Sequence, residues 1–262
     1  MVKITKLVLP VAGRGERLMP LTLNTPKALI KVAGKELLYY ALEETLDTEI
    51  EEVVVVICKS QEETIGNYLK KIKDDFKKLR FHLRFQDGPF GSGDAVFKAY
   101  DVVYPDPFIV RYPDDLLLSQ PSLLKTFSDL FRKYQTPFFS LEKMPHELIS
   151  NYGVVQLEQK EGRVYRVRGL VEHPKAEEAP SDFTVIGGYL LTAEIIDYLK
   201  EEERKMTEKG KDCLFINIGF TKHMDQGGEV CGIEFEGNRF DCGNLDGVKK
   251  AETFLGNKLV QE

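Results

Sequence analysis

The chain has 262 residues and a formal net charge of −6, with 42% hydrophobic and 30% charged residues. This composition is that of a globular protein and excludes the disordered, collagen-like and coiled-coil classes. The acidic balance argues against a general nucleic-acid binder, since affinity for the phosphate backbone depends on clustered Lys and Arg. The longest apolar run in a strand-like segment, 53–58, is far shorter than the roughly 18 residues that a membrane span needs, so no membrane partner is expected.

The cysteines and the N-terminus predict a cytoplasmic protein. Cysteines at 58, 213, 231 and 242 show no CxxC or Cys/His metal spacing, as expected for thiols in a reducing compartment. The apolar run 7–13 is followed at once by charged residues, without the small-residue cleavage site of a signal peptide. Residues 1–35 carry a net charge of +6, which favours either a small anionic ligand or a solvated surface.

The first half of the chain alternates strand-like and helix-like patterns. The expected elements are a strand at 7–12, a helix at 37–46, a strand at 53–58, a helix at 65–76, a strand at 81–85, a helix through 95–99 and a strand at 108–112. This rhythm predicts an α/β fold, Rossmann-like, with a mixed, mainly parallel sheet flanked by helices. Ligands bind at the carboxyl ends of such strands, where segments 13–17, 86–93 and 114–115 fall.

The second half is richer in strand patterns. The expected strands are 138–143, 153–159, 164–171, 185–191, 230–235 and 239–240, with a helix at 195–203, a solvated charged stretch at 201–211 and a closing helix at 245–255. No Pro-, Gly- or Ser-rich linker separates the halves. We therefore expect a single domain, 1–262, whose second half, 137–262, extends the sheet of the first, 1–136.

A glycine loop, Gly13-Arg14-Gly15-Glu16-Arg17, follows the first expected strand. Glycines let backbone N–H groups approach phosphate oxygens closely. The loop fits neither the dinucleotide fingerprint, because Leu18 holds the third glycine position, nor the P-loop, because it lacks the GK[ST] ending. Together with Lys27 the loop would suit a polyphosphate; by itself it is equally compatible with an ordinary turn.

Carboxylates stand just past two expected strands. Asp114 and Asp115 follow the strand 108–112, and Asp241 follows 239–240. Strand-end carboxylates that face one crevice can hold Mg²⁺, which takes oxygen ligands and is commonly shared with substrate phosphates. The alternative for each residue taken singly is an ordinary turn-forming Asp.

Seven short motifs occur in order along the chain: Ala12-Gly13-x-Gly15-x-Arg17, Pro26-Lys27, Gln86-Asp87-x-Pro89-x-Gly91-x-Gly93-x-Ala95, Pro113-Asp114-Asp115, Tyr152-Gly153-Val154-Val155, Val171-Glu172-x-Pro174-Lys175 and Asp241-Cys242-Gly243-Asn244. Together they resemble one known family, the sugar-1-phosphate nucleotidyltransferases, and most closely its bacterial UTP–glucose-1-phosphate uridylyltransferase branch. The resemblance runs from residue 6 to about 255. It implies the nucleotide-diphospho-sugar transferase fold, with a nucleotide-binding half at 1–136 and a sugar-binding half at 137–262.

The resemblance implies conversion of UTP and glucose-1-phosphate to UDP-glucose and pyrophosphate, by in-line attack of a sugar-phosphate oxygen on the α-phosphorus. Arg17, Lys27 and Asp114 would be the catalytic residues, and Asp114 and Asp241 would hold Mg²⁺. The nucleoside triphosphate and the sugar-1-phosphate would be the partners. Relatives form dimers or tetramers, so a homo-oligomer is expected.

The remaining implied roles concern recognition of the two substrates. The residues that would bind the nucleotide are Ala12, Gly13, Gly15, Gln86 and Gly91. An amide can both donate to and accept from the uracil edge, which suits Gln86 to this role. The residues that would bind the sugar phosphate are Gly153, Glu172 and His173.

Three departures from the family pattern leave alternatives open. Glu16 replaces the usual Thr or Ser, His173 replaces a lysine, and Ala28 stands where the uridylyl branch often has an acid. His is only partly charged near neutral pH, so Lys175 or another cation is the alternative contact for the sugar phosphate. The alternative functions are the same reaction with dTTP, CTP or GTP or with another sugar-1-phosphate, and a non-catalytic nucleotide-sugar sensor.

Overall fold

The computed structural model describes residues 2–86, 91–209 and 213–259, and the side chains of 159–160, 206–209 and 258–259 lie outside that description. The first half contains β1 (Lys6–Pro10), η1 (Glu16–Leu18), η2 (Lys27–Leu29), β2 (Lys31–Val32), β3 (Lys35–Glu36), α1 (Leu37–Glu43), β4 (Glu52–Ile57), η3 (Lys59–Gln61), α2 (Glu62–Ile72), β5 (Arg80–Phe85), α3 (Gly91–Phe97), α4 (Tyr100–Val103), β6 (Phe108–Arg111), β7 (Asp115–Leu118) and α5 (Leu123–Tyr134). The second half contains β8 (Phe138–Lys143), η4 (His146–Asn151), β9 (Gly153–Glu161), β10 (Val164–Glu172), η5 (Ala176–Glu178), β11 (Phe183–Leu191), α6 (Ala193–Lys209), α7 (Ile216–Asp225), β12 (Val230–Glu234), β13 (Asn238–Asp241) and α8 (Leu245–Leu259). The elements labelled η are 3-10 helices.

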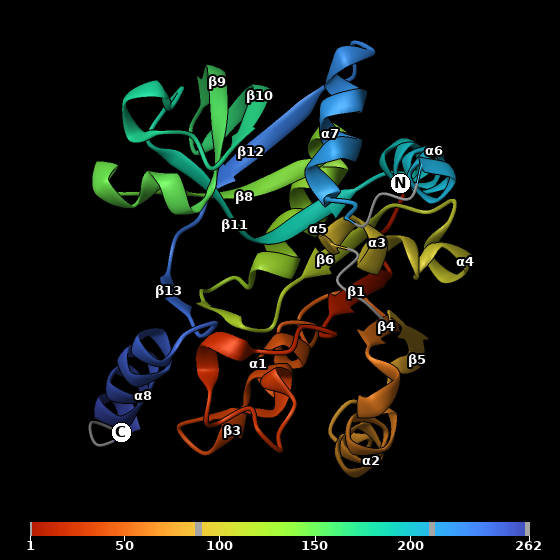
Figure 1. Ribbon diagram of the computed structural model, residues 1–262, viewed down its shortest axis with the longest axis vertical. Helices are drawn as coiled ribbons and strands as arrows, with labels where there is room; N and C mark the ends of the chain where they lie inside the picture. Colours follow the sequence, from red (N-terminus) through yellow and green to blue (C-terminus); the bar gives the residue numbers. More distant parts are fainter. Residues whose placement is uncertain (1, 87–90, 210–212, 260–262) are drawn as a thin grey trace.

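Strands from both halves join one nine-stranded sheet in the order β5-β4-β1-β6-β11-β8-β12-β10-β9 (Figure 1). The strands β5, β4, β1 and β6 are parallel to one another. Their carboxyl ends therefore lie at one edge, as the alternation of strand and helix patterns predicted. The division of function at residue 136 stays a prediction.

The expectation that the sheet is mainly parallel is correct for the first half and wrong for the second. β11 runs antiparallel to β6 and to β8, and β10 runs antiparallel to β12 and to β9; among these later strands only β8 and β12 pair in parallel. β9 also pairs with β11, so that β11, β8, β12, β10 and β9 form a closed ring. The fold is a mixed α/β fold in which an open parallel sheet continues into this small ring.

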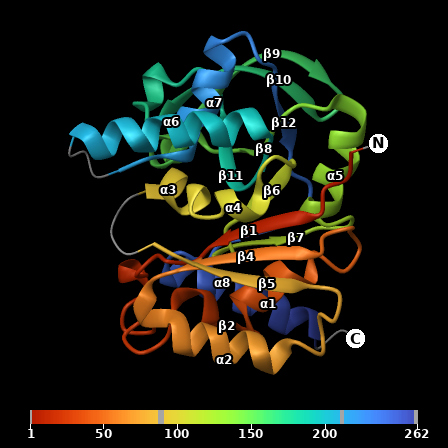
Figure 2. The ribbon, with the colours of Figure 1, turned by 90° about the vertical axis from the view of Figure 1, so that its right-hand side faces the viewer.

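The core lies on both faces of the sheet because alternate residues of each strand point to opposite sides. In β1, Leu7 and Leu9 belong to the cluster that packs under α1, α2 and α5, and Val8 belongs to the cluster under α3, α4, α6 and α7. Residues 53–57 of β4 are all fully buried, which explains their continuous β-branched run. Figure 2 shows α3 and α4 on one side of β1 and α1 and α2 on the other.

A third, smaller core supports the segments that carry the expected catalytic residues. Leu18, Leu37, Leu116 and Val248 pack together in it, with the buried thiol of Cys242. It joins η1, the two-stranded β7–β13 ladder and the closing helix α8. The loop after β1 and the segment after β13 are thus held against one another although more than two hundred residues separate them.

The sequence analysis did not predict several of these elements, among them β7, α5 and α7. α5 nevertheless carries a clear start signal, because the Ser122 hydroxyl accepts a hydrogen bond from the Lys125 backbone N–H at 3.1 Å. The solvated charged stretch expected at 201–211 belongs to α6 as far as Lys209. Residues 210–212 lie outside the described residues. Within the described part of the chain, no helix is long and apolar enough to cross a membrane.

Candidate active site

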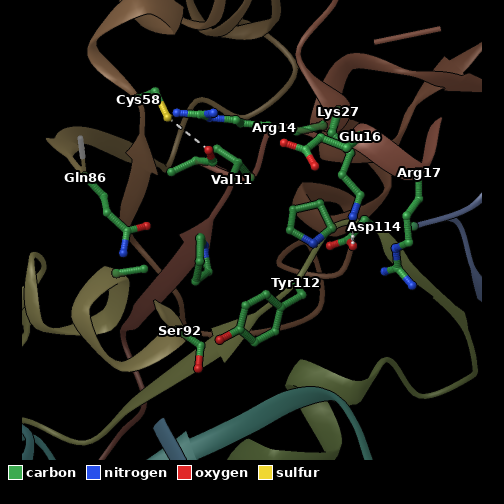
Figure 3. Close-up of a pocket in the computed structure, with 18 of the residues that line it drawn as sticks. Val11, Arg14, Glu16, Arg17, Lys27, Cys58, Gln86, Ser92, Tyr112 and Asp114 are labelled. Atoms are coloured by element: carbon green, nitrogen blue, oxygen red, sulfur yellow. Dashed lines mark hydrogen bonds and ion pairs between the residues drawn. The ribbon is translucent and has the colours of Figure 1, made fainter. Parts of the chain in front are cut away.

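A pocket of about 550 Å³ opens where the parallel strands end. Its wall includes the loop after β1, Lys27 on η2, Gln86 after β5, the start of α3, and residues 112–114 after β6. Figure 3 shows Gln86 on one side of the pocket and Lys27, Arg17 and Asp114 on the other. The structure thus brings the predicted nucleotide-binding residues Ala12, Gly13, Gly15, Gln86 and Gly91 together with the predicted catalytic residues Arg17, Lys27 and Asp114.

The glycine loop turns sharply at Gly15, whose φ of 68° lies in the left-handed region. The Thr22 hydroxyl donates to the Gly15 carbonyl oxygen at 2.8 Å, and a Cβ at Gly15 would lie 2.7 Å from the Thr22 methyl carbon. Only glycine fits this turn without strain. The turn leads directly into η1, which places the exposed side chains of Glu16 and Arg17 at the rim of the pocket.

Cationic and acidic side chains meet at one end of the pocket. The Lys27 ammonium forms an ion pair with Asp114, and both side chains are largely buried, 17% and 27% exposed. A Cβ at Gly243 would lie 3.2 Å from Arg17 Nη2, 3.2 Å from Lys27 Nζ and 2.7 Å from Asp241 Oδ1. Glycine at position 243 therefore leaves the space in which two cations and two carboxylates converge.

Asp115 does not face this space, which corrects the expectation that both neighbouring aspartates stand at the crevice. Its Oδ1 accepts a hydrogen bond from Arg239 Nε at 2.7 Å, and its Oδ2 accepts one from the Gly187 backbone N–H at 2.8 Å. Burial raises the pKa of Asp115, and the Arg239 guanidinium opposes that rise. Asp114, in the turn before β7, faces the pocket, while Asp115, the first residue of β7, anchors β7 to β11 and β13.

The predicted metal ligands, Asp114 and Asp241, suit Mg²⁺ by donor type and by position. Asp241 accepts hydrogen bonds from the Gly243 N–H at 2.9 Å and the Asn244 amide at 3.2 Å, which fix the orientation of its carboxylate. Burial raises the pKa of the neighbouring Cys242 thiol to about 12, so the thiol is neutral and the donors at hand are oxygens. The described residues contain no cluster of three or more His, Cys, Asp or Glu able to hold a metal. Two carboxylates beside two cations are an arrangement that could share Mg²⁺ with the phosphates of a substrate.

Close backbone packing shapes the opposite end of the pocket. Gly91, with a φ of 85°, lies so near the 214–216 segment that a Cβ would stand 2.3 Å from the Leu214 carbonyl oxygen. That same oxygen accepts a hydrogen bond from the Gly93 N–H at 2.8 Å, and the Ser92 hydroxyl accepts one from the Ile216 N–H at 3.1 Å. The segment before α7 thus holds the first turn of α3 against the pocket. Asp87 and Pro89 of the same motif lie outside the described residues.

The aromatic residue Tyr112 connects the pocket with the second half of the chain. Its ring lines the pocket and packs edge-on against Tyr189 of β11, with 5.9 Å between ring centroids. Burial raises the pKa of the Tyr112 phenol, and Figure 3 shows the phenol oxygen beside Ser92. Tyr112 is therefore a neutral wall between the pocket and β11.

The three predicted sugar-phosphate residues lie together, but the described wall of the pocket does not include them. Gly153 and Glu172 are register partners in the β9–β10 ladder, and a Cβ at Gly153 would lie 3.1 Å from Glu172 Oε1. Burial raises the pKa of Glu172. Burial also raises the pKa of Tyr189, and the charges of Tyr112 and Glu172 add to that rise.

His173 has a left-handed backbone with a φ of 48°. Its N–H donates to the Tyr152 carbonyl oxygen at 3.1 Å, and its Nδ1 lies 3.2 Å from the Ser150 carbonyl oxygen. The side chain is 66% exposed. The alternative cation, Lys175, is 71% exposed and pairs with Glu178 at 3.3 Å. Both side chains stand at the surface of this region.

The sequence analysis did not select several residues of the pocket wall, namely Arg14, Cys58, Ser92 and Tyr112. The Cys58 thiol donates to the Ala12 carbonyl oxygen at 3.0 Å and so ties the glycine loop to the end of β4. Cys58 and Tyr112 could have been selected from the sequence, because each stands at the end of an expected strand.

Comparison with known proteins agrees with this geometry. Residues 6–258 match the sequence profile of the family described as nucleotidyl transferase. A UTP–glucose-1-phosphate uridylyltransferase of Streptococcus pyogenes serotype M3 is 32% identical over 95% of this chain and 88% of its own length. The enzyme of that name from Pseudomonas aeruginosa is 31% identical over 98% of both chains. A crystal structure of UDP-glucose pyrophosphorylase complexed with UDP-glucose superimposes with a TM-score of 0.87 at 30% identity and covers 97% of this chain and 99% of that one.

Proposed function

Since this chain belongs to the nucleotidyl transferase family, we propose that it is the enzyme that converts UTP and glucose-1-phosphate to UDP-glucose and pyrophosphate. The observation that carries the proposal is the pocket at the strand ends, with two cations and two carboxylates at one end and the Gln86 amide with Gly91 at the other. This is the division that a nucleoside triphosphate requires, with phosphates at the charged end and the base at the amide end. The names of the relatives above supply the substrate pair.

In the proposed reaction, an oxygen of the sugar phosphate forms a bond to the α-phosphorus of UTP. The bond from that phosphorus to the oxygen of the leaving pyrophosphate breaks in line. Two anions must be brought together, so catalysis consists of positioning and of neutralising charge. Arg17 binds the triphosphate and the leaving pyrophosphate, and Lys27 binds the phosphates at the reacting centre.

Asp114 and Asp241 are the residues that would hold Mg²⁺, and the bound ion would supply charge neutralisation between the two substrates. Asp114 also keeps the Lys27 ammonium in place by their ion pair. The side chain of Tyr112 lines the pocket and packs against Tyr189 of β11. No step in this scheme needs a covalent intermediate or a general base.

The sugar phosphate is proposed to bind at the ends of β9 and β10. Glu172 offers two acceptor oxygens to sugar hydroxyls, Gly153 leaves room beside them, and His173 meets the phosphate from the rim. Burial raises the pKa of Glu172, so the carboxylate form, which accepts from hydroxyls, is favoured as pH rises.

The partners proposed are the two small-molecule substrates. The cytoplasm, where both would be available, and a dimer or tetramer of identical chains remain predictions by analogy. Light scattering of the purified chain tests the oligomeric state.

Pyrophosphate release tests the proposal. The assay crosses UTP, dTTP, CTP, GTP and ATP with glucose-, galactose- and mannose-1-phosphate in the presence of Mg²⁺. A clear maximum for UTP with glucose-1-phosphate supports the proposal. A maximum for another pair would keep the reaction and replace the substrates. Nucleotide binding without release for any pair would indicate the non-catalytic sensor.

A further inference from the structure

Hydrogen bonds within the protein fix the orientation of the Gln86 amide. Its Nε2 donates to the Gly91 carbonyl oxygen at 2.9 Å and to Asp94 Oδ2 at 3.0 Å. An amide nitrogen has two hydrogens, and both are used by these acceptors. Turning the amide over would place its oxygen against two other oxygens, so the observed orientation is the stable one.

Asp94, on α3, is one of the two groups that fix the Gln86 amide. Its side chain is buried, 7% exposed, and its second oxygen, Oδ1, lies 3.1 Å from the Lys98 ammonium one helical turn later. A carboxylate only accepts hydrogen bonds. Asp94 can therefore accept a hydrogen bond from the NH₂ group of Gln86 but cannot donate one to its oxygen.

With its nitrogen engaged, Gln86 presents its oxygen to the pocket (Figure 3). A carbonyl oxygen needs a donor on the ligand. The N3–H of uracil or thymine is such a donor, whereas the N3 of neutral cytosine is an acceptor and would repel it. We propose that Asp94 is a positioning residue that makes the site select a base with an N3–H donor and reject cytosine.

This inference rests on the proposed function, because it requires a pyrimidine at the amide end of the pocket. It adds a residue that was not among the expected nucleotide-binding residues. It also explains why an acid is useful beside a pocket for a polyanion: Asp94 contacts Gln86 and Lys98 inside the protein, on the side away from the phosphate-binding cations.

The test compares kcat/KM for UTP and for CTP in the wild-type enzyme and in Asp94→Asn. Asn has the shape of Asp, but its own amide will turn its oxygen toward Lys98 and its NH₂ toward Gln86. The Gln86 oxygen can then accept a hydrogen bond from the substituted side chain, and only the Gly91 carbonyl still favours the observed orientation. We expect the preference for UTP over CTP to fall by about tenfold or more, which is the effect of one good hydrogen bond.

The matched control is Asp101→Asn, the same chemical change at an exposed acid that pairs with Arg84 outside the pocket. It should keep the wild-type preference. The KM for glucose-1-phosphate, measured in all three proteins, should not change, because a general loss of structure would raise it whereas a change at the base would not.

A second measurement needs no variant. In N3-methyl-UTP a methyl group replaces the N3 hydrogen while both carbonyl oxygens stay, so the wild-type enzyme should use it at least about tenfold less well than UTP. An unchanged UTP-to-CTP preference in a folded Asp94→Asn, or equal use of N3-methyl-UTP, would overturn the inference while the proposed function stands. A wild-type enzyme that prefers CTP, or that uses no pyrimidine nucleotide, would overturn both, and the wild-type assay alone identifies that case.

Discussion

Lys27 and Asp114 form an ion pair in the pocket although 87 residues separate them in the chain. Lys27 lies on η2 and Asp114 immediately after β6, so the contact joins two segments that meet only when the parallel sheet is complete. The carboxylate orients the ammonium before substrates arrive. A cation oriented in advance costs little reorganisation when negative charge develops at the reacting phosphorus.

Replacing Lys27 by Met should lower kcat for pyrophosphate release by about 100- to 1,000-fold, because a preoriented charge near the α-phosphorus is lost. The matched control is Lys31→Met, since Lys31 is 61% exposed on the neighbouring β2. The control should keep kcat within about twofold, as surface charges contribute little. Equal kcat values for the two variants would remove Lys27 from the catalytic residues.

Replacing Asp241 by Asn keeps an acceptor for the Gly243 N–H but removes the charge that would hold Mg²⁺. We expect the half-saturating Mg²⁺ concentration to rise and kcat to fall by about 100-fold or more. Asp246→Asn, at a 73% exposed acid on α8, serves as the control. A Mg²⁺ titration that is the same in both variants would contradict the metal role of Asp241.

Replacing His173 by Lys should lower the KM for glucose-1-phosphate and flatten its change between pH 6 and 8. A lysine stays charged over this interval, whereas histidines commonly lose their charge within it. The control His173→Asn tolerates the same left-handed backbone but carries no charge, and it should raise KM. If neither variant changes KM, His173 does not contact the sugar phosphate.

Replacing Gly91 by Ala should disturb the base end of the pocket. The added Cβ would meet the Leu214 carbonyl oxygen at 2.3 Å, whereas Gly34, with a similar φ of 79°, has open space around it. Both substitutions should cost about 1–2 kcal/mol of stability for the left-handed backbone. Only Gly91→Ala should also raise the Kd for UTP, by at least about tenfold in calorimetry. Similar Kd values in both variants would show that the 214–216 contact does not shape the site.

Replacing Arg111 by Met should reduce the free energy of unfolding at pH 7 by about 3–5 kcal/mol, because the buried Glu44 loses its partner at 2.9 Å. Burial raises the pKa of Glu44, and Arg111 opposes that rise. A carboxyl with a raised pKa in the fold takes up a proton more readily there than in the unfolded chain, so stability falls as pH rises between the two pKa values.

Without Arg111 the interval between the two pKa values of Glu44 extends to higher pH. The variant should therefore lose more unfolding free energy at pH 7 than at pH 4.5. Urea unfolding at the two pH values measures the difference. Arg163→Met, at a 49% exposed arginine that pairs with Glu236, should stay within about 0.5 kcal/mol at both. If Arg111→Met loses the same unfolding free energy at both pH values, Glu44 has the same protonation in the folded wild type and in the folded variant.

The order of the elements and the position of the pocket were predictable because they depend on local signals. The strands at β4, β5 and β8 were expected within a residue or two from their apolar runs. Short-range rules also placed the glycine turn at Gly15 and the segment of Gln86 at strand ends. These features follow from the steric limits of the backbone and from the spacing of hydrophobic residues, and a short stretch of chain is enough to show both.

The sequence alone also determined the family resemblance and the set of charged residues available for the reaction. Only the tertiary structure decided which of them meet. It turned Asp115 inward to Arg239, 124 residues away, and left Asp114 for Lys27. It made the second half a mixed, closed ring, and it engaged the Gln86 nitrogen with Asp94. Asp114 and Asp115 are neighbours in the chain, but which of them faces the pocket depends on segments that pack against β7 from elsewhere in the chain.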